Sequence, residues 1–323
     1  MVSTPPQQKA SVARPVGSPA APLAAVPVRS ATVSLDDCRG HDSEFAELAR
    51  EAAELNNVEP RALIVRTLLH LPRVARRDGQ LRWQQIKTEL ARCAIELRTD
   101  QAKVADLVPH ATFKLQELLF VEYDERLAEQ IFGHLHYLRS ARPGSLNYAL
   151  VDPRYGQPVS LCSVSPLEWK RVGGQITRQF DVPMSAIWDI SRVYSFAVAP
   201  PNAISYLLSK VRTAIRHAAP QVELLSTAVD PNLGFTGSSY LAANWHRWMT
   251  IKPRPYLYFD RGYMSPRQLR AAFQTTNVAE LRATFDTRFE QSQATLLDSM
   301  IFCCRTRGET ENVPEGLQRR LHR

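Results

Sequence analysis

The sequence of 323 residues predicts an α/β (α+β) fold, in which a mixed sheet flanked by helices follows a small all-α module and a disordered N-terminal tail. Between residues 41 and 124, apolar side chains recur at three- and four-residue spacing, which is typical of amphipathic helices. From residue 125 onward, helical stretches alternate with short runs rich in Val, Ile and Tyr, which indicates strands. We therefore expect a helical module over residues 41–124 and an α/β domain over residues 125–305.

The two ends of the chain are predicted to be tails. The first 35 residues hold six prolines and no acidic residue, and such a segment buries too little apolar surface to offset its ordering entropy. We expect a disordered Pro/Ala-rich tail over residues 1–40 and a flexible tail over residues 306–323. No run of about 18 apolar residues occurs, so no contact with a membrane is expected. The five cysteines follow no paired spacing, and free thiols in a reducing cytoplasm are the simplest interpretation.

Three helices are expected in the helical module. The first covers residues 43–57 behind a polar N-cap, the second begins at Pro60, and the third runs from Trp83 to Leu97. Residues 41–125 carry 12 basic and 15 acidic side chains, which gives little support to a DNA-reading helix-turn-helix. We interpret the module as one for packing, dimerisation or partner docking, so a homo-oligomer or a protein partner would be held through it.

The α/β domain is expected to follow a fixed order of elements. That order is helix, hairpin, strand, helix, strand, helix and strand, over residues 125–138, 148–151 with 159–164, 188–198, 203–217, 222–229, 238–249 and 256–259. Residues 200–202 place a helix N-terminus after a strand, where free backbone N–H groups favour an anion. Asn202 suits the N-cap of that helix at least as well as contact with a ligand.

Positive charge is concentrated in one part of the chain. The whole sequence has a net charge of +8, and residues 126–275 alone carry 17 basic and 8 acidic side chains. The helical module and both tails together therefore have a net charge near neutrality. We expect the α/β domain to bind nucleic acid and the helical module by itself not to do so.

Three blocks of residues carry a resemblance to a known family. His136-Tyr137 ends the first helix of the domain, and Ser191-Arg192 precedes Ala199-Pro-Pro-Asn-Ala-Ile-Ser205. The third block is Ala228-Val-Asp-Pro followed by Gly234-Phe-Thr-Gly-Ser-Ser-Tyr240-Leu-Ala-Ala-Asn-Trp245. Through these blocks, roughly residues 125–300 resemble the Mom family of DNA-modifying proteins, which has an acyltransferase-like fold. The resemblance implies transfer of a small carbon-containing group to the exocyclic amine of adenine in DNA.

Four residues of these blocks are the candidate catalytic groups: Asp230, Tyr137, Tyr240 and His136. Asp230 follows a strand, where it could orient or deprotonate an amine, or could cap the Asp-Pro-Asn turn. Tyr240 could donate a proton to a leaving group, or could be a half-buried core tyrosine. His136 and Tyr137 point in different directions within a helix, so both reach one site only if the helix ends there.

The group donor stays open. Asn202, Ala203 and Ser205 are the candidate cofactor-binding residues, because they begin the helix that follows Arg192. The donor is unknown, and the resemblance makes an acyl-CoA-type donor one candidate. However, the Arg-x-x-Gly-x-Gly/Ala loop that holds the pyrophosphate of acyl-CoA in that family is absent between Ala199 and Ser205. No residue spacing matches a metal signature, and a site made by His136, Asp230 and a tyrosine is given little weight.

The candidate substrate-binding residues are Arg192, Asn244, Trp245, Arg247, Lys252 and Arg254. We interpret Arg192 first as a partner of Asp189 in an ion pair and second as an anion-binding group. Asn244 and Trp245 could contact a flipped base, although Trp245 would also suit the core. Basic residues mixed with Trp248, Tyr256, Tyr258 and Tyr263 suit phosphate contact with base stacking, and suit equally a charged strand edge.

Three classes of function are compatible with the sequence. The first is a Mom-like transferase that acts on a nucleic-acid base amine. The second is an acyltransferase-fold enzyme that modifies a small amine, a protein or an aminoacyl-tRNA. The third is a catalytically inactive protein that binds DNA or docks a partner.

Overall fold

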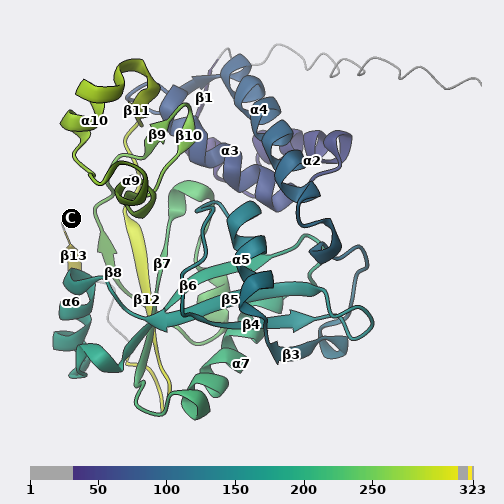
Figure 1. Ribbon diagram of the computed structural model, residues 1–323, viewed down its shortest axis with the longest axis vertical. Coiled ribbons are helices and arrows are strands. Elements are labelled where there is room, and N and C mark those ends of the chain that lie inside the picture. The colour runs from purple at the N-terminus through teal and green to yellow at the C-terminus, as the bar shows by residue number, and fades with distance from the viewer. Residues whose placement is uncertain (1–31, 312–318, 322–323) are drawn as a thin grey trace, which may run out of the picture. The chain divides into compact units, whose positions relative to one another are not determined.

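An eight-stranded mixed sheet forms the centre of the fold, in the order β13–β8–β12–β7–β6–β5–β4–β3 (Figure 1). The computed structural model describes residues 32–311 and 319–321. The strands are β3 (Leu119–Glu122), β4 (Leu146–Val151), β5 (Pro158–Pro166), β6 (Ile187–Ser195), β7 (Leu224–Val229), β8 (His246–Ile251), β12 (Ser299–Arg305) and β13 (Arg319–Leu321). Neighbours are antiparallel except for the pairs β6–β7 and β13–β8. The predicted α/β fold with a mixed sheet flanked by helices is therefore confirmed.

Helices cover both faces of this sheet. On one face, α7 (Ala203–Ala218) buries Leu207, Leu208, Val211 and Ile215 in a common apolar cluster with β4, β5 and β7. On the other face lie α1 (Leu35–Cys38), α2 (Glu44–Asn56), α3 (Pro60–Val74), α4 (Trp83–Ala102) and α5 (Glu125–His134). A further helix, α6 (Lys170–Phe180), packs against apolar side chains of β8 and β12.

The helices of the N-terminal module begin where the sequence predicts them. Ser43 caps α2 by accepting a hydrogen bond from the Ala46 N–H at 3.1 Å, and Pro60 occupies the first turn of α3. The module shares a single apolar cluster with the sheet, in which Leu63 of α3 and Leu161 of β5 are both fully buried. The domain limits given by the sequence stay a prediction, but the helices and the sheet have one continuous core.

Ordered elements lie within both segments that the sequence predicts to be tails. Residues 1–31 lie outside the described residues. Residues 32–40, by contrast, form β1 (Thr32–Ser34), which pairs with β2 (Gln80–Arg82), and α1, whose capping box uses Ser34 and Asp37. At the other end, Thr306 is buried and β13 pairs with β8, whereas residues 312–318 and 322–323 lie outside the described residues. Specific pairing and capping explain why these short segments are ordered.

One predicted helix is wrong. The sequence indicated a helix over residues 238–249, but α8 (Ser238–Ala242) ends early and β8 begins at His246. The chain leaves the helix through Asn244, which has φ 59° and is one of the residue types that tolerate this conformation. Trp248, Met249 and Ile251 are then buried, and β8 pairs with β12. Burial of these side chains determines the structure of a segment whose spacing also suits a helix.

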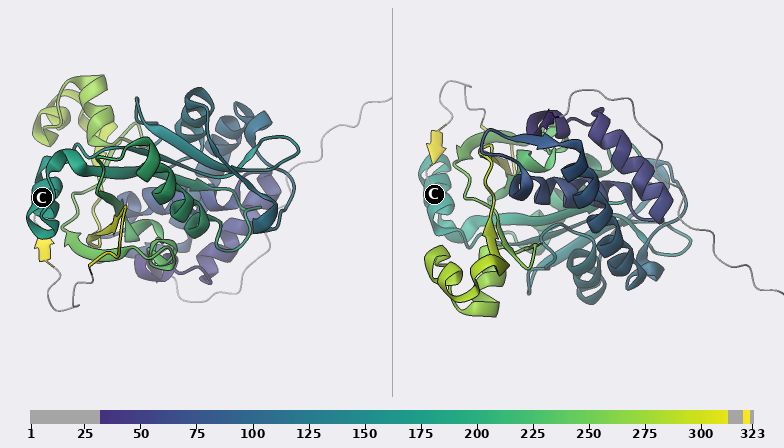
Figure 2. Two further views of the ribbon diagram at one scale, coloured as in Figure 1. Left: turned by 90° about the horizontal axis from the view of Figure 1, so that it is seen from below. Right: turned by 90° about the horizontal axis from the view of Figure 1, so that it is seen from above.

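A smaller sheet follows β8, in the order β10–β9–β11. It consists of β9 (Leu257–Phe259), β10 (Gly262–Tyr263) and β11 (Phe289–Gln291), and it is accompanied by α9 (Pro266–Phe273) and α10 (Val278–Phe285) (Figures 1 and 2). The buried Tyr258 hydroxyl donates to the Leu69 carbonyl oxygen of α3 at 2.8 Å. In the described part of the chain, no helix has the length and apolar character required to cross a membrane.

A candidate active-site cavity where β6 and β7 diverge

The candidate site lies where the two parallel strands β6 and β7 separate. Their parallel register covers Ile187–Asp189 of β6 and Leu224–Ser226 of β7. One residue further on, the Thr227 hydroxyl donates to the Ile190 carbonyl oxygen at 3.0 Å, and β6 then continues to Ser195 in pairing with β5. A cavity of about 540 Å³ opens beyond this point. Crevices at the carboxyl ends of diverging parallel strands are common ligand sites in open α/β sheets.

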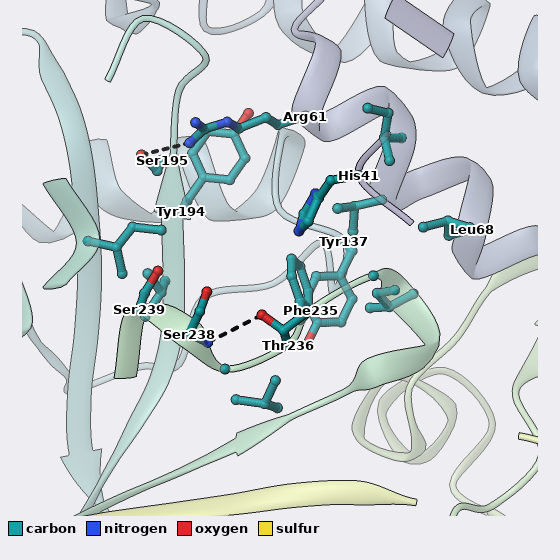
Figure 3. A pocket seen from close by; sticks show the side chains of 18 of the residues that line it. His41, Arg61, Leu68, Tyr137, Tyr194, Ser195, Phe235, Thr236, Ser238 and Ser239 are labelled. Atoms are coloured by element: carbon teal, nitrogen blue, oxygen red, sulfur yellow. Dashed lines mark hydrogen bonds between the residues drawn. The ribbon is translucent and has the colours of Figure 1, made fainter. Parts of the chain in front are cut away.

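Five parts of the chain line the cavity. They are the end of β6, the end of β7 with the loop into α8, the segment after α5, the first turn of α7 through Ile204, and the helical module with residues 38–40 before it. Figure 3 shows His41, Arg61 and Leu68 of the module on the opposite side of the cavity from Thr236 and Ser238. This wall could not be foreseen from the sequence, because His41 and Arg61 are isolated residues of a net acidic segment. No motif brings them together, and only the tertiary packing of α3 on the sheet does so.

His136 and Tyr137 both line the cavity, because α5 ends at His134. Their rings stack with centroids 4.4 Å apart, and His136 Nδ1 accepts a hydrogen bond from the Leu138 N–H at 3.2 Å. Burial, assisted by Arg192, lowers the pKa of His136 well below its usual value. Burial, assisted by Asp230, raises the pKa of Tyr137. Near neutral pH the site therefore presents a neutral imidazole and a protonated phenol.

Asp230 is held firmly beside this site without lining the cavity itself. Its Oδ1 accepts hydrogen bonds from Asn232, through the backbone N–H at 3.0 Å and the side-chain Nδ2 at 2.8 Å. Its Oδ2 accepts from the Tyr256 hydroxyl at 2.5 Å. Asp230 also forms the N-cap of the short 3-10 helix Pro231–Leu233. This is the turn-capping role that the sequence offered as one of two alternatives. Asp230 also contributes to the raised pKa of Tyr137, which lines the cavity.

Tyr240 lines the cavity from α8 and is packed on two aromatic rings. Its ring stacks on Phe302 with centroids 5.6 Å apart and meets Trp245 edge-on at 5.4 Å. Its hydroxyl lies 3.5 Å from the Thr227 hydroxyl, and burial raises its pKa, so the phenol stays protonated. Gly237 makes this packing geometrically feasible: it has φ 79°, and a Cβ there would lie 2.3 Å from the Phe302 ring.

Arg192 lines the cavity but does not form the expected ion pair with Asp189. The guanidinium donates instead to Ser140, through Nε to the carbonyl oxygen at 2.8 Å and through Nη2 to the hydroxyl at 3.1 Å. Nη1 donates to the Ser191 carbonyl oxygen at 2.6 Å. Asp189 accepts a hydrogen bond from the Ser226 hydroxyl at 3.3 Å, and burial raises its pKa to about 6. Ser140, in the loop after α5, thus accepts the hydrogen bonds of the guanidinium for which the sequence predicted Asp189 as the partner.

The other predicted binding residues lie outside the cavity lining. Asn202 occupies the N-cap position of α7 with φ 66°, and its side chain makes no capping hydrogen bond. Ala203 is buried, and the Ser205 hydroxyl donates to the Asn202 carbonyl oxygen at 3.0 Å. Only Ile204 from this first turn lines the described cavity. Asn202 therefore holds the predicted N-cap position without a capping hydrogen bond, and the role of the turn in holding a cofactor stays a prediction.

The predicted basic and aromatic surface is also separate from the cavity. Trp245 is 1% exposed and belongs to the core, which is the second of the two roles that the sequence left open for it. Asn244, Arg247, Lys252 and Arg254 are exposed. Base stacking on the aromatic residues near them is excluded for Trp248, Tyr256 and Tyr258, because the side chains of all three are buried. In residues 32–311 and 319–321, no group of three or more His, Cys, Asp or Glu side chains is placed to hold a metal ion.

The fold and the cavity define an α/β protein whose candidate site lies between diverging strands of a mixed sheet. The chain belongs to the Mom protein family, since the family model matches residues 117–299, more than half of its length. This membership indicates a transferase that modifies a base of DNA. A search of curated proteins gave no match. A solved structure assigned as a phosphinothricin N-acetyltransferase is similar, with 12% identity, 60% of this chain and 99% of that chain covered, and a TM-score of 0.29.

Proposed function

We propose that the protein transfers a small carbon-containing group to the exocyclic amine of a nucleic-acid base, most concretely to N6 of adenine in DNA. One observation carries the proposal: a single cavity gathers Tyr137, His136, Arg192 and Tyr240 from three separate blocks of the sequence. All four residues lie within the range matched by the Mom family model. The acceptor amine would enter from the open side of this cavity.

The chemistry requires a proton acceptor, because an exocyclic amine must lose a proton as its nitrogen forms the new N–C bond. We assign proton acceptance to the Asp230 carboxylate, which Asn232 and Tyr256 hold in one orientation. The Tyr137 hydroxyl would orient the amine. Tyr240, whose raised pKa keeps it protonated, would donate a hydrogen bond or a proton to the leaving part of the donor. His136 supports the Tyr137 ring through stacking.

The size and lining of the cavity suit an extruded base. The adenine amine is engaged in pairing within a duplex, so the base must leave the stack before the amine can react. A volume of about 540 Å³ lies within the range typical of small-molecule sites. Phe235, which is 36% exposed, presents apolar surface to the cavity, against which a flat ring can pack. No step of this proposal depends on acyl-CoA.

Nucleoside mass spectrometry tests the proposal. DNA from cells that express the protein should contain a modified deoxyadenosine that is absent from cells without the gene. Tyr240→Phe and Asp230→Asn should remove the modified nucleoside while the protein stays folded by circular dichroism. Tyr155→Phe is the matched control, because it removes the hydroxyl of a tyrosine that is 77% exposed and lies in the β4–β5 turn. Unchanged nucleosides in the wild-type sample would refute adenine modification.

A further inference from the structure

One end of the cavity is built by the helical module, which lies outside the range matched by the family model. Arg61 is the second residue of α3 and reaches across to the last residue of β6, where its Nη1 donates to the Ser195 hydroxyl at 3.4 Å. Figure 3 shows the Arg61 side chain beside the Tyr194 ring at this end of the cavity. The three residues therefore bring together a cation and two hydroxyl groups.

The four arginines that line the described cavity differ in how their guanidinium groups are used. Arg39 pairs with Asp36 and donates to Asn232, and Arg192 donates to Ser140. Arg50 donates to the His41 carbonyl oxygen at 2.6 Å. Arg61 is exposed, and its one side-chain hydrogen bond within the described structure is the long one to Ser195. Its planar set of N–H donors is therefore largely available to a ligand.

Tyr194 provides a second, independent observation at the same end. The residue is 8% exposed and lines the cavity, yet its hydroxyl is buried without a hydrogen-bond partner in the described structure. Burial raises its pKa well above the usual value, so the hydroxyl keeps its proton and remains a donor. A buried hydroxyl without a partner is unfavourable, and an acceptor supplied by a ligand would satisfy it.

The charges around this point favour an anion. Asp42 is the one acidic residue among the described cavity-lining side chains, which include four arginines. The carboxyl of Glu59 also acts on Tyr194, but it is buried and accepts the Ala197 N–H at 2.7 Å. Burial raises the pKa of Glu59 to about 7, which reduces its negative charge near neutral pH. The N-terminus of the 15-residue helix α3 adds a partial positive charge.

We infer that Arg61, Tyr194 and Ser195 form a subsite that binds a phosphate group of a ligand in the cavity. The guanidinium can contact two phosphate oxygens at once, and both hydroxyl groups can donate to the remaining oxygens. The phosphate belongs either to the DNA strand beside the extruded base or to a phosphorylated group donor. The inference rests on the proposed function for the identity of the ligand, and it makes the helical module part of the binding site.

Two binding measurements on the full chain test the subsite and separate the two sources. The first is fluorescence anisotropy with a labelled single-stranded oligonucleotide that contains adenine, repeated over a range of salt concentrations. The second is calorimetry with inorganic pyrophosphate. If the phosphate belongs to DNA, Arg61→Gln should weaken binding of the oligonucleotide about ten-fold, which is ~1.4 kcal/mol. If it belongs to the group donor, the same variant should weaken binding of pyrophosphate by this amount. For DNA, the plot of log K against the logarithm of the salt concentration should also become less steep by about 0.7, as expected for the loss of one phosphate contact on a single strand.

Two further variants make the result specific. Tyr194→Phe removes one hydroxyl and keeps the ring, so it should weaken the same probe as Arg61→Gln without loss of folded structure. Arg98→Gln is the matched control, because it removes an exposed arginine of α4 that does not line the cavity. The inference is overturned if the wild type binds neither probe, or if Arg61→Gln and Tyr194→Phe bind both probes as the wild type does.

These outcomes are distinct from those of nucleoside mass spectrometry. If the wild type modifies no base and yet Arg61→Gln weakens phosphate binding, the proposed function fails and the subsite stands. If DNA is modified and neither variant changes the binding of either probe, the subsite fails and the proposed function stands.

Discussion

Glu59 links the helical module to the loop after β6, and its burial predicts a pH-dependent stability. The residue immediately precedes α3, is 7% exposed, and accepts a hydrogen bond from the Ala197 N–H at 2.7 Å. Burial raises the pKa of its carboxyl from 4.5 to about 7, although the Ala197 N–H and Arg61 act in the opposite direction. The ionised form of Glu59 is therefore less favourable in the folded protein than in the unfolded chain.

The size and sign of the effect follow from this pKa. A difference of about 2.5 between the folded and unfolded pKa corresponds to about 3 kcal/mol, an order-of-magnitude figure. Because the folded pKa is the higher one, the folded state binds the proton more tightly. The contribution of Glu59 to stability is thus fully present below about pH 4.5 and is lost as the pH rises through about 7.

Glu59→Gln isolates this contribution, since glutamine keeps an oxygen that can accept the Ala197 N–H and cannot ionise. We expect the free energy of unfolding of the variant, relative to that of the wild type, to be about 3 kcal/mol higher at pH 8 than at pH 4.5, because only the wild type loses this stability as the pH rises. Urea unfolding at the two pH values measures this difference. Glu129→Gln, at an exposed position of α5, is the control and should change the difference by less than ~0.5 kcal/mol. Identical pH dependence of wild type and Glu59→Gln would refute the reasoning.

Two substitutions near the cavity test how it is held together. Gly237→Ala places a Cβ 2.3 Å from the Phe302 ring, at a residue with φ 79°. We expect overpacking and backbone strain to lower the free energy of unfolding, measured with urea, by about 2–4 kcal/mol. A variant as stable as the wild type would contradict this. Asn232→Ala removes side-chain hydrogen bonds to Asp230 and Arg39 and two to the Leu297 backbone, at about 1 kcal/mol each. We expect a loss of about 4 kcal/mol and of the modified nucleoside, and retention of both would show that Asn232 does not position Asp230.

The elements that could be predicted are those whose signals are local. The N-cap at Ser43 and Pro60 at the start of α3 involve residues a few positions apart, and both are found as expected. The helix expected over residues 238–249 failed for the opposite reason. Its apolar spacing suits a helix, but its structure depends on the pairing of β8 with β12, about fifty residues further along the chain. Contacts between distant segments decided that structure, and no local pattern records them.

In the candidate site, too, the residues of the motif blocks could be predicted from the sequence, whereas contacts between distant segments could not. The three motif blocks placed Tyr137, Arg192 and Tyr240 in one site, and the structure brings all three to the same cavity. Their catalytic and binding roles stay predictions. The partner of Arg192 could not be predicted, because Ser140 lies 52 residues earlier in the chain and reaches the strand through the loop after α5. Arg61 carried no signal at all, since its significance arises from the packing of α3 against the end of β6.

The net charge of the helical module does not describe the side of the module that faces the cavity. Residues 41–125 have a net negative charge, and for that reason we expected this module by itself not to bind nucleic acid. On α2, however, Ala46 and Arg50 line the cavity, whereas the exposed Glu47 and Glu51 directly follow them in the chain and lie about 100° further around the helix. Exposed charges are screened within about 8 Å at physiological salt, so the acidic side has a weak effect on a ligand in the cavity. Binding depends on the charges that face the ligand, and on that side of the module arginine predominates.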